Sequence, residues 1–291
     1  MDIKTRIKSV LNITAPVFMT KYYYRKILKK KLDLKSPTSL NEKINWLKLY
    51  YWPYQKISTV VADKYMARDY VKEKGCGNLL NSLIGVWDRV NDIPWDTLPE
   101  QFVIKCGHGC GMNIICFQKS QMDKNAVFNK LNTWMKTDWG KNSCEPHYSN
   151  IKPKIICEAF LGNSQKKELP DDIKIHCFHG KPEFIAYYSE RANDLHGTFY
   201  DIEWKHLDIA TKEGALVDKP KCLTDLLSAA EILSSDLPYA RIDFYVIDSK
   251  PFFGEITLTP ASGRSTYMRE EYDIKYGNLL DLSKCGFNKN N

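Results

Sequence analysis

The stretch Arg241-Ile-Asp-Phe-Tyr-Val-Ile-Asp-Ser-Lys-Pro-Phe-Phe-Gly-Glu255 decides how the C-terminal part of the chain folds. Two apolar runs are joined by the turn residues Asp248-Ser249-Lys250, a pattern that predicts two strands and a tight turn. Side chains alternate between the two faces of a strand. Arg241 and Asp243 therefore share one face of the first strand, and Glu255 and Thr257 share one face of the second.

Two carboxylates beside an arginine suit a divalent cation and a phosphate group. Mg²⁺ takes oxygen ligands and usually shares them with nucleotide phosphates, and an arginine can form a two-pronged bond to phosphoryl oxygens. A β-hairpin with exposed charges accounts for the same residues. On this stretch alone, both interpretations stay open.

Composition indicates a folded globular protein. The chain has 291 residues and 43% hydrophobic content, enough to bury the core of one large or two modest domains. Glycine and proline are scattered without a run or a repeat.

Positive charge is concentrated at the N-terminus. Residues 1–35 hold ten Lys or Arg against two Asp, whereas the rest of the chain holds 32 basic and 33 acidic residues. Apolar residues such as Ile7, Val10 and Phe18 are interleaved with these charges. The segment suits an anionic membrane surface or an anionic partner, where each cation contributes about 1 kcal/mol. The alternative is a solvated helix whose apolar stripe packs on the body. No nucleic-acid-binding motif is present.

The sequence favours a cytoplasmic protein, with peripheral attachment to the inner face of the membrane as an option. Neither a signal peptide nor an apolar window long enough to span a bilayer is present. Nine cysteines without paired spacing indicate reduced thiols. Cys106, His108 and Cys110 are a weak zinc candidate, because no second cluster completes four ligands.

Periodicity predicts helices in the N-terminal third. Ser39-Leu-Asn-Glu42 has the spacing of a capping box, and the helix that it starts ends before Pro53. A second helix is expected from Val61 to Lys74. A strand follows at Leu83–Val86.

From Gln101 onward, strands alternate with helices, and several strands pair as hairpins. The expected strands are 102–105, 112–117, 154–160, 172–178, 182–188 and 198–204, the expected helices are 123–136 and 224–234, and a polar tail begins at Ser262. This order predicts an α+β protein and not a doubly wound parallel sheet.

The loop Lys105-Cys-Gly-His-Gly-Cys-Gly111 lies between two of these strands. Three glycines in five residues let the backbone approach an anion closely, and Lys105 adds a point charge. The loop is neither a Walker nor a Rossmann motif, because no helix follows it. A glycine-rich hairpin turn is the alternative, although a hairpin needs only one or two glycines.

Taken in order, these segments resemble the ATP-grasp superfamily, and specifically its TupA-like branch. The superfamily resemblance rests on Asp63-Lys64-Tyr-Met-Ala-Arg, Phe102-Val-Ile-Lys105 with its glycine loop, Ile155-Ile-Cys-Glu158, Pro170-Asp-Asp172-Ile-Lys-Ile, Arg241-Ile-Asp243 and Glu255-Ile-Thr257. The branch is indicated by Ser39-Leu-Asn-Glu-Lys-Ile-Asn-Trp-Leu-Lys, Pro146-His-Tyr148-Ser-Asn-Ile-Lys-Pro-Lys-Ile-Ile and Phe178-His-Gly-Lys-Pro. One departure is Thr257, where such sites usually carry asparagine.

The resemblance implies a nucleotide bound between two α+β subdomains. It implies a basic helical region at 1–60, a subdomain with the glycine-rich loop at 61–157, and a subdomain with the magnesium and phosphate site at 158–291. The implied cofactors are ATP and Mg²⁺. The implied nucleotide-binding residues are Lys64, Lys105, Gly107, Gly109, Gly111, Glu158 and Asp172; the implied metal ligands are Asp243, Glu255 and Thr257; and Arg241 and Lys105 are the implied catalytic residues.

The activity implied by the resemblance is an ATP-dependent carboxylate–amine ligase that works through an acyl phosphate. TupA-like members resemble enzymes of surface-polysaccharide assembly, which implies a hexuronic acid and an amino acid or other amine as substrates. Lys174, Arg191 and Arg264 are candidates to bind the acceptor carboxylate. His108 and His176 are weaker candidates for proton transfer. A non-catalytic nucleotide-binding accessory protein and a sugar kinase are the alternatives.

Overall fold

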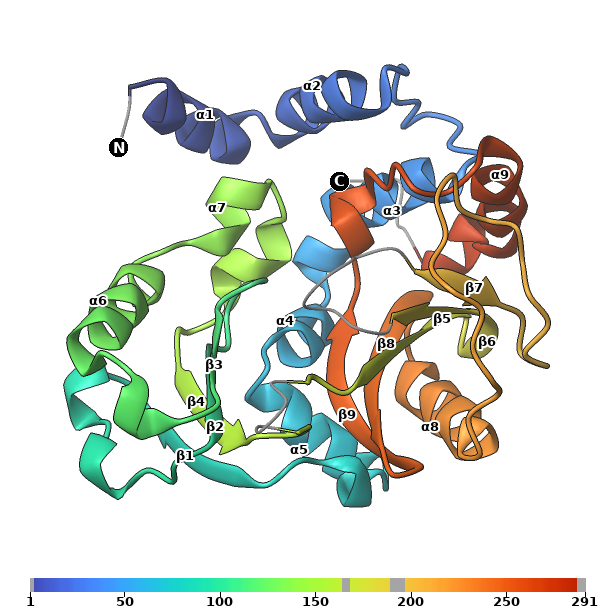
Figure 1. The fold of residues 1–291 in the computed structure, drawn as a ribbon. Coiled ribbons are helices and arrows are strands. Elements are labelled where there is room, and N and C mark those ends of the chain that lie inside the picture. The colour runs from blue at the N-terminus through green and yellow to red at the C-terminus, as the bar shows by residue number, and fades with distance from the viewer. Residues whose placement is uncertain (1–2, 164–167, 189–196, 287–291) are drawn as a thin grey trace.

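A computed structural model describes residues 3–163, 168–188 and 197–286, and it contains two antiparallel sheets surrounded by helices (Figure 1). The four-stranded sheet and the five-stranded sheet lie side by side and take their strands from successive parts of the chain (Figure 1). The expected α+β class is therefore confirmed.

The four-stranded sheet has the order β1-β4-β2-β3. Its strands are β1 (Leu83–Trp87), β2 (Phe102–Cys106), β3 (Asn113–Cys116) and β4 (Ile155–Ala159). Helix α6 (Lys124–Met135) begins at an Asp123 cap, which accepts bonds from two backbone amides of the first turn. It contributes the buried residues Val127 and Leu131 to a core shared with Phe102 and Ile104.

The five-stranded sheet has the order β7-β6-β5-β8-β9. Its strands are β5 (Asp171–Phe178), β6 (Lys181–Tyr188), β7 (Thr198–Tyr200), β8 (Tyr239–Ile247) and β9 (Lys250–Thr257). Helix α8 (Leu223–Ser234) packs against β5, β6 and β8, and it buries Leu226, Ala230 and Leu233. The apolar positions of this helix recur at three- and four-residue spacing, which places them on one face.

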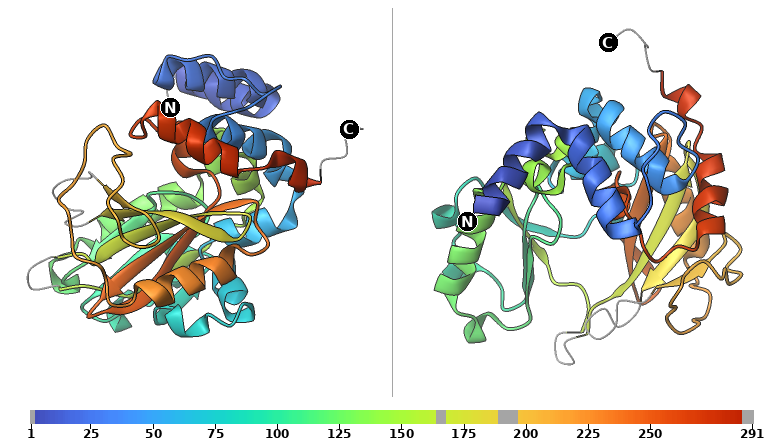
Figure 2. Two further views of the ribbon diagram at one scale, coloured as in Figure 1. Left: turned by 90° about the vertical axis from the view of Figure 1, so that its right-hand side faces the viewer. Right: turned by 90° about the horizontal axis from the view of Figure 1, so that it is seen from above.

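The N-terminal third is helical, as expected. It contains α1 (Ile3–Thr14), α2 (Pro16–Leu28), α3 (Leu40–Tyr50), α4 (Lys56–Ala62) and α5 (Met66–Glu73). Short 3₁₀ helices occupy many of the connections along the described chain: Trp52–Tyr54, Gly77–Leu79, Val90–Asp92, Trp95–Thr97, Lys119–Gln121, Pro146–Asn150, Pro260–Gly263 and Leu282–Cys285. Figure 2 shows α1 and α2 on the same side of the molecule as α3.

Three expected elements differ from the structure. The single helix predicted over 61–74 is wrong, because the chain breaks at Asp63–Tyr65 into α4 and α5. The strand predicted over 198–204 ends at Tyr200, where a turn held by Asp201 begins. The tail predicted from Ser262 as polar contains a helix, α9 (Glu270–Leu279), whose polar sequence has only a weak apolar stripe. Helix α7 spans Trp139–Ser143.

Two hydrophobic cores underlie the two sheets, and α4 and α5 belong to the second. Val61, Ala67, Tyr70 and Val71 are buried in the same cluster as the five-stranded sheet. The domain boundaries expected from the sequence stay predictions. The packing shows that the helices flanking Lys64 are anchored to the sheet that carries the β8–β9 hairpin.

The expected capping box at the start of α3 is present. The Ser39 hydroxyl accepts a bond from the Glu42 amide at 3.3 Å, and a Glu42 carboxylate oxygen accepts one from the Ser39 amide at 3.3 Å. Glu42 also accepts bonds from the amides of Asp33 and Thr38, at 3.1 and 2.9 Å. The cap thus fixes both the helix and the segment that leads into it.

We expect Ser39→Ala to lower the free energy of unfolding by about 1 kcal/mol, because one amide of the first helical turn loses its acceptor. Urea denaturation measures this loss. Ser36→Ala is the matched control, since Ser36 is exposed and only its backbone amide bonds to Asp33. Equal stability of the two variants would contradict the importance of the cap.

Candidate nucleotide and phosphate site

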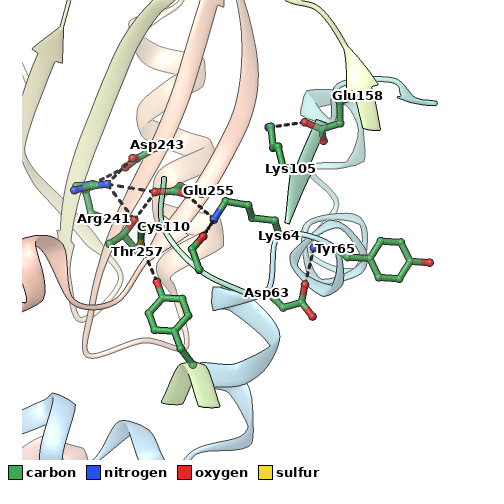
Figure 3. A network of polar contacts seen from close by, with 12 residues as sticks. Asp63, Lys64, Tyr65, Lys105, Cys110, Glu158, Arg241, Asp243, Glu255 and Thr257 are labelled. Atoms are coloured by element: carbon green, nitrogen blue, oxygen red, sulfur yellow. Dashed lines mark hydrogen bonds and ion pairs between the residues drawn. The ribbon is translucent and has the colours of Figure 1, made fainter. Parts of the chain in front are cut away.

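The β8–β9 hairpin brings four polar side chains onto one face. Asp248 and Ser249 both have positive φ angles, of 49° and 63°, which is typical of the two-residue turns that match strand twist. The resulting register places Asp243 opposite Glu255 and Arg241 opposite Thr257. Residues directly opposite each other in an antiparallel pair lie on the same face. Figure 3 shows these four side chains grouped together.

A β-bulge at Gly254 adjusts this register. The pairing shifts between Asp243 and Phe244, and Gly254 is the extra residue of β9. A Cβ atom at this position would lie 2.9 Å from the carbonyl oxygen of Asp243. Glycine is therefore required for the close approach of the two strands directly beside the acidic pair.

Arg241 holds the group together. Its Nε and Nη2 donate to the two carboxylate oxygens of Asp243, at 2.7 and 2.6 Å, and Nη2 also donates to Thr257 Oγ1 at 3.1 Å. The Thr257 hydroxyl donates to Glu255 at 3.1 Å. Burial alone would lower the pKa of Arg241, but the facing Asp243 carboxylate holds that pKa well above its usual value. The guanidinium therefore stays charged.

Lys174 extends the cluster onto β5. Its Nζ lies 2.7 Å from Asp172 and 2.6 Å from Asp243, because Lys174 is the cross-strand partner of Asp243. The sequence predicted Lys174 as a carboxylate-binding residue for the acceptor. The structure places it between two carboxylates of the protein, and its predicted role toward a substrate stays a prediction.

Lys64 enters the site from the break between α4 and α5. Its Nζ donates to the carbonyl oxygen of Gly109 at 2.8 Å and lies 3.4 Å from Glu255 (Figure 3). Burial would raise the pKa of Glu255, but the charges of Lys64, Arg241 and Lys174 lower it to about 2. Glu255 is therefore a carboxylate at physiological pH, with 32% of its side chain exposed.

The glycine loop packs closely against this lysine. The Gly107 amide donates to Lys154 at 2.9 Å, and the Gly107 carbonyl accepts from the Lys64 amide at 3.2 Å. A Cβ at Gly107 would lie 2.9 Å from Asp63 Oδ1, and Gly111 adopts a φ of +68°. Gly109 supplies the carbonyl for Lys64. A Cβ at Gly109 would lie 3.1 Å from the side chains of Met112 and Trp139. Close packing or a positive φ thus accounts for each of the three loop glycines, and their predicted contact with phosphate stays a prediction.

A second ion-pair cluster lies beside the loop. Glu158 on β4 accepts from Lys105 Nζ at 2.7 Å and from Arg68 Nη1 at 2.7 Å. Arg68 also donates to the carbonyl oxygen of Asn81 at 2.7 Å. Sequence reasoning assigned no role to Arg68, which lies in the first turn of α5, four residues after Lys64. The structure joins Arg68 to Lys105 and Glu158, each of which was predicted separately as a nucleotide-binding residue.

A cleft between the two sheets adjoins this second cluster. Its walls come from β2, β3 and β4 of one sheet and from β8 and β9 of the other, and they are mostly apolar. The lining residues are Asn81, Val103, Lys105, Asn113, Ile115, Glu158, Ala159, Phe160, Leu161, Leu169, Pro170, Tyr245 and Phe253. A mostly apolar cleft with a few polar groups is typical of sites that bind small molecules.

The segment after β9 is strained and is held by α3. Ala261, Ser262 and Gly263 have consecutive φ angles of 47°, 56° and 70°, a conformation that non-glycine residues rarely adopt. Asn45 Nδ2 donates to the Gly263 carbonyl at 2.6 Å, and Lys48 Nζ donates to the Ser262 carbonyl at 3.0 Å. Burial lowers the pKa of Lys48 to about 8, to which the charge of Arg264 contributes.

Arg264, a predicted acceptor-binding residue, follows this segment. Its guanidinium lies 5.2 Å from the ring centroid of Tyr23 on α2, and its Nε is buried without a hydrogen-bond partner among the described residues. Arg191, the third predicted residue of this kind, lies outside the described residues. The role of both arginines toward a substrate stays a prediction.

The remaining predicted candidates lie in the core. The ring of His176 bonds to the Tyr239 hydroxyl at 2.8 Å and stacks on Phe184. His108 bonds to the carbonyl oxygen of Trp134 at 3.0 Å. Burial lowers the pKa of both histidines. Within residues 3–163, 168–188 and 197–286, no group of three or more His, Cys, Asp or Glu side chains is placed to hold a metal ion. All nine cysteines are described and free.

Arg68→Met should lower the free energy of unfolding by about 2–3 kcal/mol, because Glu158 is largely buried and would keep only Lys105 as a partner. Adding Glu158→Gln should recover part of the loss, since the uncompensated charge is then removed. Urea denaturation of the single and double variants measures both effects. Arg89→Met, which breaks an exposed ion pair with Asp92, should change stability by less than about 0.5 kcal/mol.

His147, in the 3₁₀ helix Pro146–Asn150, generates a pH prediction. It is fully buried, and burial lowers its pKa to about 4. The unfolded chain takes up a proton near pH 6.5, whereas the folded protein does not until about pH 4. Stability should therefore fall as the pH drops between these values, by up to about 3 kcal/mol.

His147→Gln should reduce the slope of stability against pH within that window. Chemical denaturation at half-unit pH steps measures the slope. His206→Gln, which alters an exposed histidine paired with Glu213, should leave the slope close to that of the wild type. A slope unchanged by His147→Gln would show that this histidine does not titrate as described.

Comparison with known proteins supports the resemblance. The family model for TupA-like ATP-grasp proteins matches residues 42–281. No curated protein sequence matches the chain at a significant level. No helix within the described part of the chain is both long and apolar enough to cross a membrane.

Among solved structures, the chain is similar to two D-alanine–D-alanine ligases and an L-amino acid ligase. The ligase from Bacillus anthracis is 20% identical, with a TM-score of 0.46 and coverage of 77% of this chain and 66% of its own. The ligase from Helicobacter pylori is 16% identical, with a TM-score of 0.48 and coverage of 84% and 68%. The L-amino acid ligase from Bacillus licheniformis is 12% identical, with a TM-score of 0.45 and coverage of 77% and 49%.

The chain thus spans between about half and two thirds of the length of these three proteins. The family match, in contrast, covers 240 of its 291 residues, including both ion-pair clusters and the glycine loop. The resemblance inferred from the ordered motifs is confirmed: the chain belongs to the TupA-like ATP-grasp family and has the ATP-grasp fold.

Proposed function

We propose that the protein is an ATP-dependent carboxylate–amine ligase that forms an amide through an acyl phosphate. The observation that carries this proposal is the position of Lys64, which connects the glycine loop to Glu255 and thus to the Arg241–Asp243 pair. Phosphoryl transfer depends mainly on positioning and on neutralisation of charge. This cluster supplies both next to a cleft of suitable character.

The charges of the described site fit a triphosphate. Five cations (Lys64, Arg68, Lys105, Lys174 and Arg241) contact four carboxylates (Glu158, Asp172, Asp243 and Glu255) in the ion pairs described above. This set has a surplus of one positive charge. The apolar cleft beside Lys105 suits the flat base of the nucleotide, and Lys105 and Lys64 would face its phosphates.

The donor set also fits magnesium. Asp243 and Glu255 offer carboxylate oxygens, and the lowered pKa of Glu255 keeps it ionised. Two carboxylates are sufficient when phosphate oxygens and water complete the coordination. Bound there, Mg²⁺ would neutralise charge on the phosphates and polarise the transferred group. Thr257 is the weakest ligand of the predicted three, because its hydroxyl already bonds to Arg241 and Glu255.

The proposed reaction has two steps. An oxygen of the acceptor carboxylate attacks the γ-phosphorus, the bond to the β-phosphate oxygen breaks, and ADP leaves. The nitrogen of an amine then attacks the acyl carbon, loses a proton and displaces inorganic phosphate. Arg241, charged and preorganised by Asp243, would stabilise the transferred phosphoryl group and then the oxyanion of the tetrahedral intermediate.

We infer a hexuronic acid and an amino acid or other amine as the substrates, in the assembly of a capsular or related surface polysaccharide. Membership of the TupA-like family supports this choice of substrates. Arg264 is the cation best placed near the end of β9 to bind the acceptor carboxylate, because Lys174 is engaged by Asp172 and Asp243.

A nucleotide-binding accessory protein without turnover is the second candidate. Thr257, which replaces the asparagine usual at this position, is the observation that favours it. Tight ATP binding without ADP release, under every acceptor mixture, would support this candidate over the ligase.

We expect ADP release that requires both a uronic acid and an amine, with an amide product detected by mass spectrometry. Asp243→Asn and Glu255→Gln should each lower the rate at least about 100-fold, because each removes a carboxylate from the proposed magnesium site. Glu203→Gln, in an exposed ion pair with Lys205 away from the site, is the matched control. A stable phosphorylated sugar would identify a kinase instead, and full activity of both site variants would refute the site.

A further inference from the structure

We propose that helices α1 and α2 bind the surface of an anionic lipid bilayer. The proposal is independent of the reaction at the nucleotide site. It rests on a surface that combines exposed apolar side chains with exposed cations. Figures 1 and 2 show the two helices along one side of the molecule, away from the turn of the β8–β9 hairpin and from α8.

Exposed apolar side chains are concentrated on these two helices. Fifteen large hydrophobic residues are exposed in the described part of the chain, and six of them lie within residues 7–27. The six are between 42 and 62% exposed: Ile7, Val10, Ile13, Phe18, Tyr22 and Ile27. Scattered exposed apolar residues are ordinary, whereas a cluster of this kind marks an interaction surface.

The opposite faces of the same helices are fixed to the body. Asn12 Nδ2 donates to the Lys141 carbonyl at 2.6 Å, and Thr20 contacts Cys144 at 3.5 Å. Met19 and Tyr24 are buried, the latter with Leu49 of α3. Phe18 and Tyr22 lie four residues apart, on one helical face. The exposed apolar residues are therefore a separate face, and not a core stripe that has yet to pack.

Exposed cations lie on the same two helices as the apolar face and in the segment directly after them. The exposed basic residues on or just after the helices are Lys8, Lys21, Arg25, Lys26, Lys29, Lys30, Lys31 and Lys35. Lys30 pairs with Glu270 at 2.7 Å. Residues 1–35 carry a net charge of +8, whereas the remaining chain carries −1. An anionic surface would thus attract this face in preference to the others.

The chemistry of the surface favours lipid over other partners. Phosphate headgroups match the lysines and arginines, while Ile, Val and Phe side chains can enter the boundary between headgroups and acyl chains. A second copy of the chain would oppose two surfaces of the same positive charge. A nucleic acid would contact the cations but leave the aliphatic side chains exposed to water. A bilayer surface satisfies both components at once.

Sedimentation of the full chain with vesicles tests the proposal. The protein should bind vesicles of phosphatidylcholine with 30% phosphatidylglycerol, and binding to pure phosphatidylcholine should be at least tenfold weaker. Raising the salt from 50 to 500 mM should weaken binding to the anionic vesicles, because surface charges are then screened. Absence of binding to anionic vesicles at low salt would overturn the proposal.

Two exposed substitutions isolate the apolar component. Val10→Ser together with Phe18→Ser should lower the partition coefficient at least tenfold, because two buried apolar contacts with the bilayer are lost. Leu216→Ser is the matched control, since Leu216 is 69% exposed but lies far along the chain from these helices. Binding of the double variant equal to that of the control would overturn the proposal.

A third variant isolates the charge. Lys21→Gln together with Lys26→Gln should lower the partition coefficient about 25-fold, or fivefold per charge. Thermal unfolding and light scattering of each variant serve as controls for folding and association. Vesicle binding that is unchanged in the lysine double variant would refute the proposal that this surface binds lipid. A change only in oligomeric state in the serine double variant would refute it as well, and would assign the surface to another partner.

Discussion

The pairing of Asp243 with Arg241 is the interaction on which the rest of the site depends. Only 4% of the Asp243 side chain is exposed, and a carboxylate so far from water must be compensated by cations and hydrogen bonds. Arg241 binds both of its oxygens, and Lys174 adds a second cation. The pair lies on β8, which is hydrogen-bonded to β5 on one side and to β9 on the other.

Asp243 and Arg241 belong to a chain of ion pairs in which acidic and basic side chains alternate. Asp172, Lys174, Asp243, Arg241, Glu255 and Lys64 follow one another, each within 3.6 Å of the next. Three parts of the chain, far apart in sequence, supply these groups. The ion pairs of Lys174 with Asp243 and of Lys64 with Glu255 join two of these parts, so the electrostatics of the site and the packing of its elements support each other. The same arrangement keeps Glu255 ionised although its surroundings are partly desolvated.

Much of the fold could be predicted because its signals are local. The β8–β9 hairpin follows from alternation around Asp248 and Ser249, and the start of α3 follows from the spacing of Ser39 and Glu42. The ion pair between Arg68 and Glu158 could not be predicted, because it depends on how α5 packs against β4. Helix α9 was missed, because its exposed and polar residues carry little periodic signal.

Helix α3 also carries a polar stripe that faces inward. Asn41, Asn45 and Lys48 recur at helical spacing and face inward, where polar residues are rare. All three hold the backbone that follows β9: Asn41 at Ser265, Asn45 at Gly263 and Lys48 at Ser262. A polar stripe in a buried helix thus compensates three left-handed residues next to the site.

The contacts of α3 with the backbone after β9 also affect the position of Thr257 and Glu255. The left-handed segment begins two residues after Thr259, whose hydroxyl bonds to Glu145, and four after Thr257, which bonds to Arg241. Backbone strain persists only where the surroundings over-determine it. Helix α3 and Glu145 therefore fix the end of β9 from one side, while Arg241 fixes it from the other. The guanidinium of Arg264, which follows this segment, lies over the ring of Tyr23 on α2. The N-terminal helices are therefore coupled by packing to the strand that carries Glu255.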